Sequence, residues 1–325
     1  MLNALALFIA GLAILIVGAE FIVRGGTSLA ARFRIPPLVI GLTIVAVGTS
    51  APELAVGIDA VLYGNGDLAV GNIAGTNVVN ILLILGLSAL MRPLALRGTT
   101  LRLDLPMIVA ASLAFLVMAA DGSLSRVEGL FLVTASMAYT AAVVHMARQE
   151  RRSEQVAAAR ELKSAALAPK RIGSRVRDLA VLLAGIAIVV MGADWLVRGS
   201  VDLARLWDVS DEFIGLTVIA IGTSSPELVT TVVSTIRNQR DIAVGNLLGS
   251  SAYNILFILG ITCIVPSSAI PVAPLLTAVD IPVMTAVAFL CIPVFYSGRQ
   301  ITRAEGALFV GTYMGYLAYL LATRT

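Results

Sequence analysis

The feature that most constrains this chain is an apolar stretch that occurs twice. Gly41 to Gly86 returns as Gly215 to Gly260 without a gap, and the two copies agree at 22 of 46 positions. The shared positions include glycine, proline, hydroxyl, amide and carboxylate groups, each of which is expensive to place inside an apolar membrane helix. Lipid-facing helices can exchange Leu, Ile and Val at little cost, so the retained polar groups indicate that both copies have the same role.

Apolar runs long enough to cross a membrane recur along the whole chain. Its 325 residues are 58% hydrophobic and only 13% charged, whereas a soluble protein of this length needs a more polar surface. A span needs roughly 20 apolar residues to cross about 30 Å of hydrocarbon. We therefore predict an all-α membrane protein with ten transmembrane helices. The expected helices are Leu2–Val23, Pro37–Leu62, Leu68–Met91, Leu103–Ala120, Val127–Met146, Leu179–Val197, Phe213–Ile236, Ile242–Val265, Leu275–Tyr296 and Ala307–Ala322.

The basic residues predict how these helices are oriented. The loops after the odd-numbered helices hold 19 Lys and Arg residues, and the opposite side holds 4. The positive-inside rule therefore places both termini outside the cytoplasm and the 148–178 segment inside it. This asymmetry also explains the net charge of +3 without a nucleic-acid partner. The cations of the segment are mixed with alanines and acids, which favours a solvated linker, with a regulatory lipid-binding site as the alternative.

The repeat reaches beyond the central stretch and divides the chain into two halves. Asp104-Leu105-Pro106 resembles Asp280-Ile281-Pro282, so the similarity includes the fourth and ninth predicted helices. Five helices are thus followed by five more, and because five is odd, the second copy is inverted relative to the first. We expect residues 1–147 and 179–325 to form the two repeats, with the 148–178 linker between them and a substrate site at mid-membrane.

Glu53 and Glu227 lie near the middle of the second and seventh predicted helices. An ionised carboxylate at that depth costs several kcal/mol unless a positive charge meets it. A protonated, hydrogen-bonded glutamic acid would explain one such residue, but two at matched positions of inverted repeats favour a cation site. Pro52 and Pro226 each remove a backbone hydrogen bond just before the acid. We therefore predict that helices 2 and 7 are broken there and leave free carbonyl oxygens at the site.

Hydroxyl groups accompany the two acids. Thr49 and Thr223 precede them by one helical turn and share their helix face. Carboxylates, hydroxyls and free carbonyls form an all-oxygen set, which suits hard cations such as calcium and sodium. Softer metals would need Cys or His. Cys263 and Cys291 lie in apolar runs as expected free thiols, and His145 falls at the end of the fifth predicted helix.

The third and eighth predicted helices supply a second set of polar positions. Thr76 and Asn80 are one turn apart in the first copy, and Ser250 and Asn254 match them in the second. Such groups also serve as ordinary hydrogen-bonding contacts between membrane helices. Their recurrence beside both acidic helices favours cation coordination for the two asparagines.

Other acidic residues have simpler explanations. Asp67 and Asp241 begin the third and eighth predicted helices, so we expect them to act as N-terminal caps. Glu20, Asp59 and Asp194 lie near a predicted membrane face, where placement in the interface accounts for them. We do not expect these acids to bind the cation.

The paired Gly-Thr-Ser-x-Pro-Glu and Gly-Asn-x-x-Gly-x-x-x-x-Asn segments resemble the two alpha repeats of the cation/calcium exchanger superfamily, in its prokaryotic sodium/calcium exchanger branch. The resemblance covers essentially the whole chain. It implies a ten-helix antiporter of the inner membrane that extrudes calcium against an inward sodium gradient, works as a monomer and needs no cofactor. It also implies that the first and sixth helices, whose glycines predict loose packing, slide across the core.

The resemblance further implies which residues bind the ions. Calcium binding is expected from the glutamates and threonines of the two motifs, Glu53, Glu227, Thr49 and Thr223. Sodium binding is expected from both halves, at Ala46, Ser50, Glu53, Thr76, Asn80, Ala220, Ser224, Glu227, Ser250 and Asn254.

Other functions stay open at this point. Some sodium-coupled members of the superfamily carry Asp at one of the positions of Asn80 and Asn254, so the number of coupled ions is open. The calcium/proton branch typically has Gly-Asn-x-x-Glu where this chain has Gly-Thr-Ser-x-Pro-Glu, which favours sodium, although carboxylates also take protons. A cation channel could use an acidic constriction as well. An enzyme is not predicted, because the sequence offers no paired-Asp, Ser-Lys or His-metal arrangement.

Overall fold

The computed structural model describes residues 2–161, 175–206 and 220–324, and it is built almost entirely from helices. Within those ranges, nine helices are long and apolar enough to cross a membrane. They confirm the predicted class of all-α membrane protein. The further predicted span, Phe213–Ile236, falls partly outside the described residues, so the count of ten stays a prediction.

The first half of the chain contains five crossings, three of which are interrupted. The first crossing is α1 (Leu2–Phe33) and the fifth is α8 (Arg126–Glu161). The elements between them are α2 (Pro37–Ile40), the π-turn η1 (Gly41–Val45), α3 (Ala46–Thr49), α4 (Ala51–Leu62), α5 (Gly66–Val78), the π-turn η2 (Val79–Leu85), α6 (Gly86–Met91), strand β1 (Leu94–Ala95), the π-turn η3 (Thr100–Asp104), α7 (Leu105–Met118), the 3-10 turn η4 (Ala119–Asp121) and strand β2 (Ser123–Leu124).

The described part of the second half follows the same order. It begins with α9 (Arg175–Leu206) and ends with α16 (Arg303–Arg324). The elements between them are α11 (Ala220–Thr223), α12 (Ser225–Ile236), α13 (Arg240–Tyr253), the π-turn η6 (Asn254–Leu259), α14 (Gly260–Ile264), strand β3 (Ile270–Pro271), the π-turn η7 (Leu276–Asp280), α15 (Ile281–Gly298) and strand β4 (Gln300–Ile301).

Three helices run well past their predicted ends. α1 ends at Phe33, ten residues after the predicted Val23, and α8 continues past Met146 to Glu161, into the segment predicted as a linker. α9 begins before and ends after the predicted range 179–197. Hydropathy marks where hydrocarbon ends, but Ala, Arg, Glu and Gln are good helix formers, so the helices continue into water.

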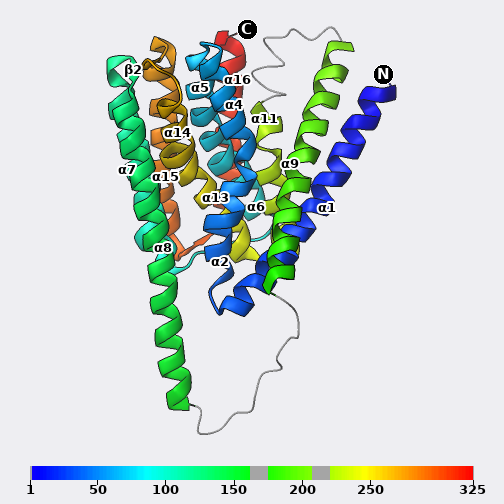
Figure 1. Cartoon of the computed structure of the whole chain (residues 1–325), viewed down its shortest axis with the longest axis vertical. Coiled ribbons are helices and arrows are strands. Elements are labelled where there is room, and N and C mark those ends of the chain that lie inside the picture. Colours follow the sequence, from blue (N-terminus) through cyan, green and yellow to red (C-terminus); the bar gives the residue numbers. More distant parts are fainter. Residues whose placement is uncertain (1, 162–174, 207–219, 325) are drawn as a thin grey trace.

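The helices run roughly along the long axis of the molecule, and α1 and α9 lie together at one side of it (Figure 1). The start of α1 and the end of α16 lie at one end, which we call the termini end (Figure 1). The end of α8 and the start of α9 lie at the opposite end, which we call the linker end (Figure 1).

Glycines bring α1 and α9 into direct backbone contact. A Cβ atom added to Gly18 would lie 2.8 Å from the backbone nitrogen of Val189, and one added to Gly185 would lie 2.7 Å from that of Ile22. Leu15, Ile22 and Val189 belong to a small hydrophobic cluster separate from the main core. The prediction of loose packing was therefore wrong for the contact between α1 and α9, because the glycines allow close approach. The two helices form one packed unit beside the core.

Two short strand pairs join the halves of the chain. β1 pairs with β4, with Leu94 opposite Ile301, and β2 pairs with β3, with Ser123 opposite Pro271. In each pair the two strands come from different halves. The pairs close the connections before the fourth and ninth crossings and after them, so neither half is complete without the other.

Asp67 and Asp241 also connect the halves. Asp67 accepts a hydrogen bond from the backbone N–H of Ala273 at 2.6 Å, and Asp241 pairs with Arg97 at 2.5 Å. Neither caps its own helix, because α5 and α13 each begin one residue before the aspartate and have no side-chain cap. The capping prediction was wrong: both acids lie in the first helical turn, and tertiary partners from the opposite half occupy their oxygens.

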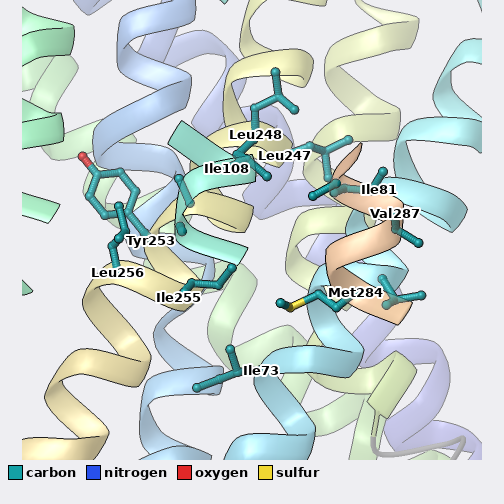
Figure 2. Packing of buried hydrophobic residues seen from close by; sticks show 14 of the residues in the cluster. Ile73, Ile81, Ile108, Leu247, Leu248, Tyr253, Ile255, Leu256, Met284 and Val287 are labelled. Carbon is teal, nitrogen blue, oxygen red and sulfur yellow. The ribbon is translucent and has the colours of Figure 1, made fainter. Parts of the chain in front are cut away.

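The main hydrophobic core surrounds α13, in which every residue from Ile242 to Tyr253 is buried. Figure 2 shows Ile73 and Ile81 from the third crossing meeting Leu247 and Ile255 of the eighth, with Met284 of α15 beside them. A continuous helix hydrophobic on all sides is typical of a bundle centre. The polar motif residues of α13 are therefore held inside protein and away from lipid.

Candidate cation-binding site

The second and the seventh of the predicted membrane spans are both interrupted at the motif. α3 ends at Thr49 and α11 ends at Thr223, and the following residues, Ser50 and Ser224, have nearly the same non-helical backbone angles (φ −83°, ψ 13° and φ −82°, ψ 2°). A proline is the second residue of each new helix, where its missing N–H is tolerated and its ring blocks a continuous helix through the preceding turn. The predicted breaks are thus present at both copies of the motif.

Glu53 and Glu227 lie just beyond these breaks, each as the third residue of its helix. Both are fully buried, with 0% of their surface exposed. The first N–H groups of a helix have no partner within it and carry a partial positive charge, which favours an anion at that position. Ser50, at the first break, donates a hydrogen bond to Glu227, so the two breaks lie against each other. The breaks therefore place two acids in one buried region.

Glu227 is held by hydroxyls from other helices. Its Oε1 atom accepts a hydrogen bond from Ser50 Oγ at 2.8 Å and a longer one from Ser250 Oγ at 3.3 Å. Ser50 comes from the first motif copy and Glu227 from the second, so the two copies meet at this carboxylate. Ser250 Oγ also lies 3.4 Å from the backbone oxygen of Ala46, which accepts the backbone N–H of Ser50 at 3.1 Å as well, so the predicted free carbonyl is not found at Ala46.

A chain of side-chain hydrogen bonds extends from Thr49. Its Oγ1 donates to Asn246 Oδ1 at 3.1 Å, and Asn246 Nδ2 donates to Thr231 Oγ1 at 3.3 Å. Neither Asn246 nor Thr231 was predicted as a site residue. Asn246 could have been recognised because the Gly-Asn pair recurs in both repeats, whereas Thr231 has a glycine, Gly57, at the matching position and gave no signal.

Several buried oxygen atoms at the site have no hydrogen-bond partner. They are both carboxylate oxygens of Glu53, Oε2 of Glu227, and the amide oxygens Oδ1 of Asn80 and Asn254, whose amide nitrogens have no partner either. A buried polar group without a partner costs on the order of 1–3 kcal/mol, and a charged one costs more. A hard cation would satisfy the carboxylate and amide oxygens together, and calcium takes such all-oxygen ligand sets. The residues present fit a transported calcium or sodium ion.

The packing of elements brings each asparagine beside an acidic helix of the other half. η2, which carries Asn80, packs against α12, and η6, which carries Asn254, packs against α4. Both asparagines are at 0% exposure. π-turns are rare and recur at functional sites, because the extra residue per turn frees backbone groups and re-aims side chains. Hydropathy carries no signal for them, so the sequence did not predict these turns.

The remaining predicted residues are placed as follows. Thr76, Ser224 and Thr223 are buried, at 3%, 1% and 6% exposure. Ala220 is the first residue of α11, and its side chain falls outside the described part of the molecule. The ligand roles of these residues stay predictions. Elsewhere, Cys263 and Cys291 are buried free thiols as expected.

The α1–α9 unit contacts the core near the linker end. α1 packs against α12 there, and Glu20 of α1 accepts hydrogen bonds from Arg24 at 2.7 Å and from Arg237 at 2.9 Å. Arg237 follows the last residue of α12, so this ion pair joins the α1–α9 unit to the core. Glu20 is therefore more than an interfacial residue, because it forms a contact between two packed units.

The matching contacts at the termini end are weaker. The described parts of α9 and α4 make no packing contact comparable to that of α1 with α12. Asp194, at the repeat position of Glu20, pairs with Arg198 of its own helix at 2.9 Å. Tyr63 stands at the position of Arg237 and is 77% exposed. Among the described residues, the contacts between the α1–α9 unit and the core are thus asymmetric: α1 packs on α12, and an ion pair joins the two, whereas α9 and α4 have no such contact.

Comparison of the sequence and the fold with known proteins identifies similar membrane proteins. A family model described as sodium/calcium exchanger protein matches residues 3–145 and 178–322. The chain is similar to the inner membrane protein YrbG of Escherichia coli strain K12, with 38% identity over 326 residues that cover 98% of this chain and 97% of that protein. It is also similar to the putative antiporter CaxA of Alkalimonas amylolytica, with 33% identity over 322 residues and 99% of both chains covered.

Two further similarities concern proteins named as exchangers. The sodium/calcium exchanger MaX1 of Methanosarcina acetivorans is 29% identical over 339 residues, which cover 95% of this chain and 96% of that protein. Among solved structures, the sodium-calcium exchanger NCX_Mj soaked with 2.5 mM Na+ and 0.1 mM Ca2+ matches with a TM-score of 0.82 at 26% identity, over 98% of both chains. The similarity in sequence and in fold therefore extends over nearly the whole molecule.

Proposed function

Because the chain belongs to the sodium/calcium exchanger family, we propose that it exchanges sodium for calcium across the membrane by alternating access at the acidic site. The observation that carries the proposal is the set of buried, unpartnered oxygens on Glu53, Glu227, Asn80 and Asn254. Two carboxylates and two amides in one buried region suit a cation as their partner, and the protein supplies no Lys or Arg contact to either acid among the described ion pairs.

Ion exchange follows from competition for the same oxygens. One calcium ion neutralises two carboxylates, and sodium ions can replace it at the same atoms. The empty site, with two buried negative charges, is the costliest state to carry through an occluded form. Loading by either ion lowers that barrier, so ions are exchanged and do not leak. In this proposal calcium is bound by Glu53, Glu227, Thr49 and Thr223, and sodium by Ala46, Ser50, Glu53, Thr76, Asn80, Ala220, Ser224, Glu227, Ser250 and Asn254.

We propose further that the chain forms two inverted five-helix halves, with Phe213–Ile236 as the tenth span. Matched contacts between the halves support this arrangement. Gly86 faces Gly306 and Gly129 faces Gly260, so the same pair of close approaches occurs twice. The strand pairs β1–β4 and β2–β3 are likewise exchanged between halves. We propose that the linker end faces the cytoplasm of an inner membrane, and that the contact of α1 with α12 belongs to a state closed to the cytoplasm.

The ion pair between Glu20 and Arg237 gives a test of alternating access. Arg237→Gln should raise the calcium concentration needed for half-maximal transport from the termini side by up to about five-fold. An exposed ion pair stabilises a contact by about 0.2–1 kcal/mol. Without the pair, the state closed at the linker end is less stable, so a smaller fraction of molecules has the site open to the termini side. Calcium-45 uptake into vesicles of known sidedness measures this value.

Arg198→Gln is the matched control for that variant, because Arg198 pairs with Asp194 within one helix and does not join the two packed units. We expect it to leave the half-maximal concentration unchanged. An equal shift in both variants, or none in Arg237→Gln, would contradict the proposed role of the Glu20–Arg237 ion pair in alternating access.

The coupling ion is tested by comparing gradients in one preparation. In proteoliposomes, an outward sodium gradient is expected to drive calcium-45 uptake, and a pH gradient of equal driving force is expected to give only background uptake. Uptake driven by pH and not by sodium would identify the alternative, a calcium/proton antiporter. Calcium flux that needs no counter-ion gradient would instead indicate a channel.

A further inference from the structure

A groove outside the cation site runs along α8. Its volume is about 730 Å³, and its walls come from α8, from the η1–α3 part of the second crossing and from the α13–η6 junction. Met137 and Ala141 of α8 are exposed along it, and so is Val47 on the opposite wall. The groove therefore opens toward the surroundings of the molecule at membrane depth.

The walls of the groove suit a hydrocarbon chain. The hydroxyls that line it are already bonded to protein: Thr43 donates to the backbone oxygen of Val39 at 2.6 Å, and Ser136 donates to that of Val133 at 2.7 Å. Thr140 and Tyr253 bond each other at 2.6 Å. These hydroxyls have made their hydrogen bonds within the protein, so an apolar occupant costs no hydrogen bond.

The length of the groove matches one leaflet of a bilayer. Its lining residues on α8 run from Ser136 to Arg148, which corresponds to about 18 Å of helix at 1.5 Å per residue. The apolar part of α8 spans Arg126–Gln149, so Ser136 lies near its middle and Arg148 at its edge. Half of a hydrocarbon core is about 15 Å thick. A lipid tail seated in the groove would place its headgroup beside Arg148.

The headgroup end of the groove is basic. His145 and Arg148 line it there, and both side chains are exposed. These two basic residues are not part of the internal repeat. When Arg126 is aligned with Arg303, the positions that match His145 and Arg148 are Ala322 and Thr325. The basic end is thus particular to the linker end of the molecule. In the proposed orientation it faces the cytoplasmic leaflet, whose anionic lipids attract cations near the surface.

We propose that this groove binds one anionic phospholipid, with an acyl chain between α8 and the second crossing and the phosphate headgroup at Arg148 and His145. The occupant would touch Val47, which lies two residues before Thr49 of the cation site. The leaflet assignment rests on the proposed membrane orientation, but the binding itself does not depend on which ions are transported.

Native mass spectrometry of the intact protein with dioleoyl phosphatidylglycerol or dioleoyl phosphatidylcholine tests the proposal without a transport assay. We expect one tightly retained phosphatidylglycerol per chain and about five-fold lower retention of phosphatidylcholine, because a cation near the headgroup favours an anionic lipid by about that factor. Arg148→Gln should remove most of this preference. Ala141→Trp should fill the groove and lower the retention of both lipids.

Arg34→Gln is the matched control, because Arg34 is an exposed arginine near the same end of the molecule but outside the groove. It should retain phosphatidylglycerol as the unmodified protein does. Equal retention of the two lipids by the unmodified protein would overturn the proposal. An equal loss in Arg34→Gln and Arg148→Gln would overturn it too, because attraction would then come from the basic surface as a whole.

Discussion

Glu53→Gln and Glu227→Gln are each expected to reduce sodium-driven calcium-45 uptake to the level of empty vesicles. Both acids are fully buried, and they supply the only carboxylate oxygens found at the site among the described residues. Replacing one carboxylate by an amide removes a full charge from the calcium site. A charge-assisted contact is worth about 1.5–3 kcal/mol, and two such contacts at one carboxylate correspond to a loss of at least a hundred-fold in calcium affinity.

The control for these variants is Glu128→Gln. Glu128 Oε2 accepts hydrogen bonds from the backbone N–H of Ser125 at 2.7 Å and from its hydroxyl at 2.8 Å, at the start of α8. This capping arrangement accepts Gln as well as Glu, so the variant should fold and transport calcium normally. Normal calcium uptake by either Glu53→Gln or Glu227→Gln would refute the assignment of the site.

Gly18→Leu is expected to lower the melting temperature of the purified protein strongly and to abolish transport. A Cβ at this position would lie 2.7 Å from Val189 Cγ2, 2.8 Å from Val189 N and 3.0 Å from Gly185 O. Two of these neighbours are backbone atoms of α9, which cannot move without displacing the helix. Overpacking a core costs about 1–3 kcal/mol even when side chains can adjust, and here the helices themselves must separate.

Gly311→Leu makes the same substitution on α16, where a Cβ would meet nothing within 4 Å. We expect its melting temperature, measured by fluorescence during heating in detergent, to stay close to that of the unmodified protein. If Gly18→Leu also melted normally, α1 and α9 would not be the tightly packed unit described above.

Features with a local cause were predictable from the sequence. The apolar runs identified the nine described crossings, because hydrocarbon thickness sets their length. The breaks after Thr49 and Thr223 followed from the prolines, and the burial of Glu53 and Glu227 followed from their depth in those crossings. Each of these depends on a few neighbouring residues and on the membrane alone.

Features with a tertiary cause were not predictable in the same way. Asp67 and Asp241 look like caps in sequence, but their partners, Ala273 and Arg97, lie in the opposite half of the chain. Asn246 lacked a predicted role because its bond to Thr49 exists only when the eighth crossing packs on the second. The π-turns and the groove along α8 likewise depend on packing between distant segments, which a single sequence does not specify.

The exchange of strands between the halves has a consequence for how the protein is made. β1 is synthesised early, but its partner β4 follows nearly at the end of the chain. A contact between segments so far apart in the sequence forms slowly and late in folding. The β1–β4 pair can therefore form only after nearly the whole chain has been synthesised. The joining of the two halves is thus a late event, which cannot begin with the synthesis of the first half alone.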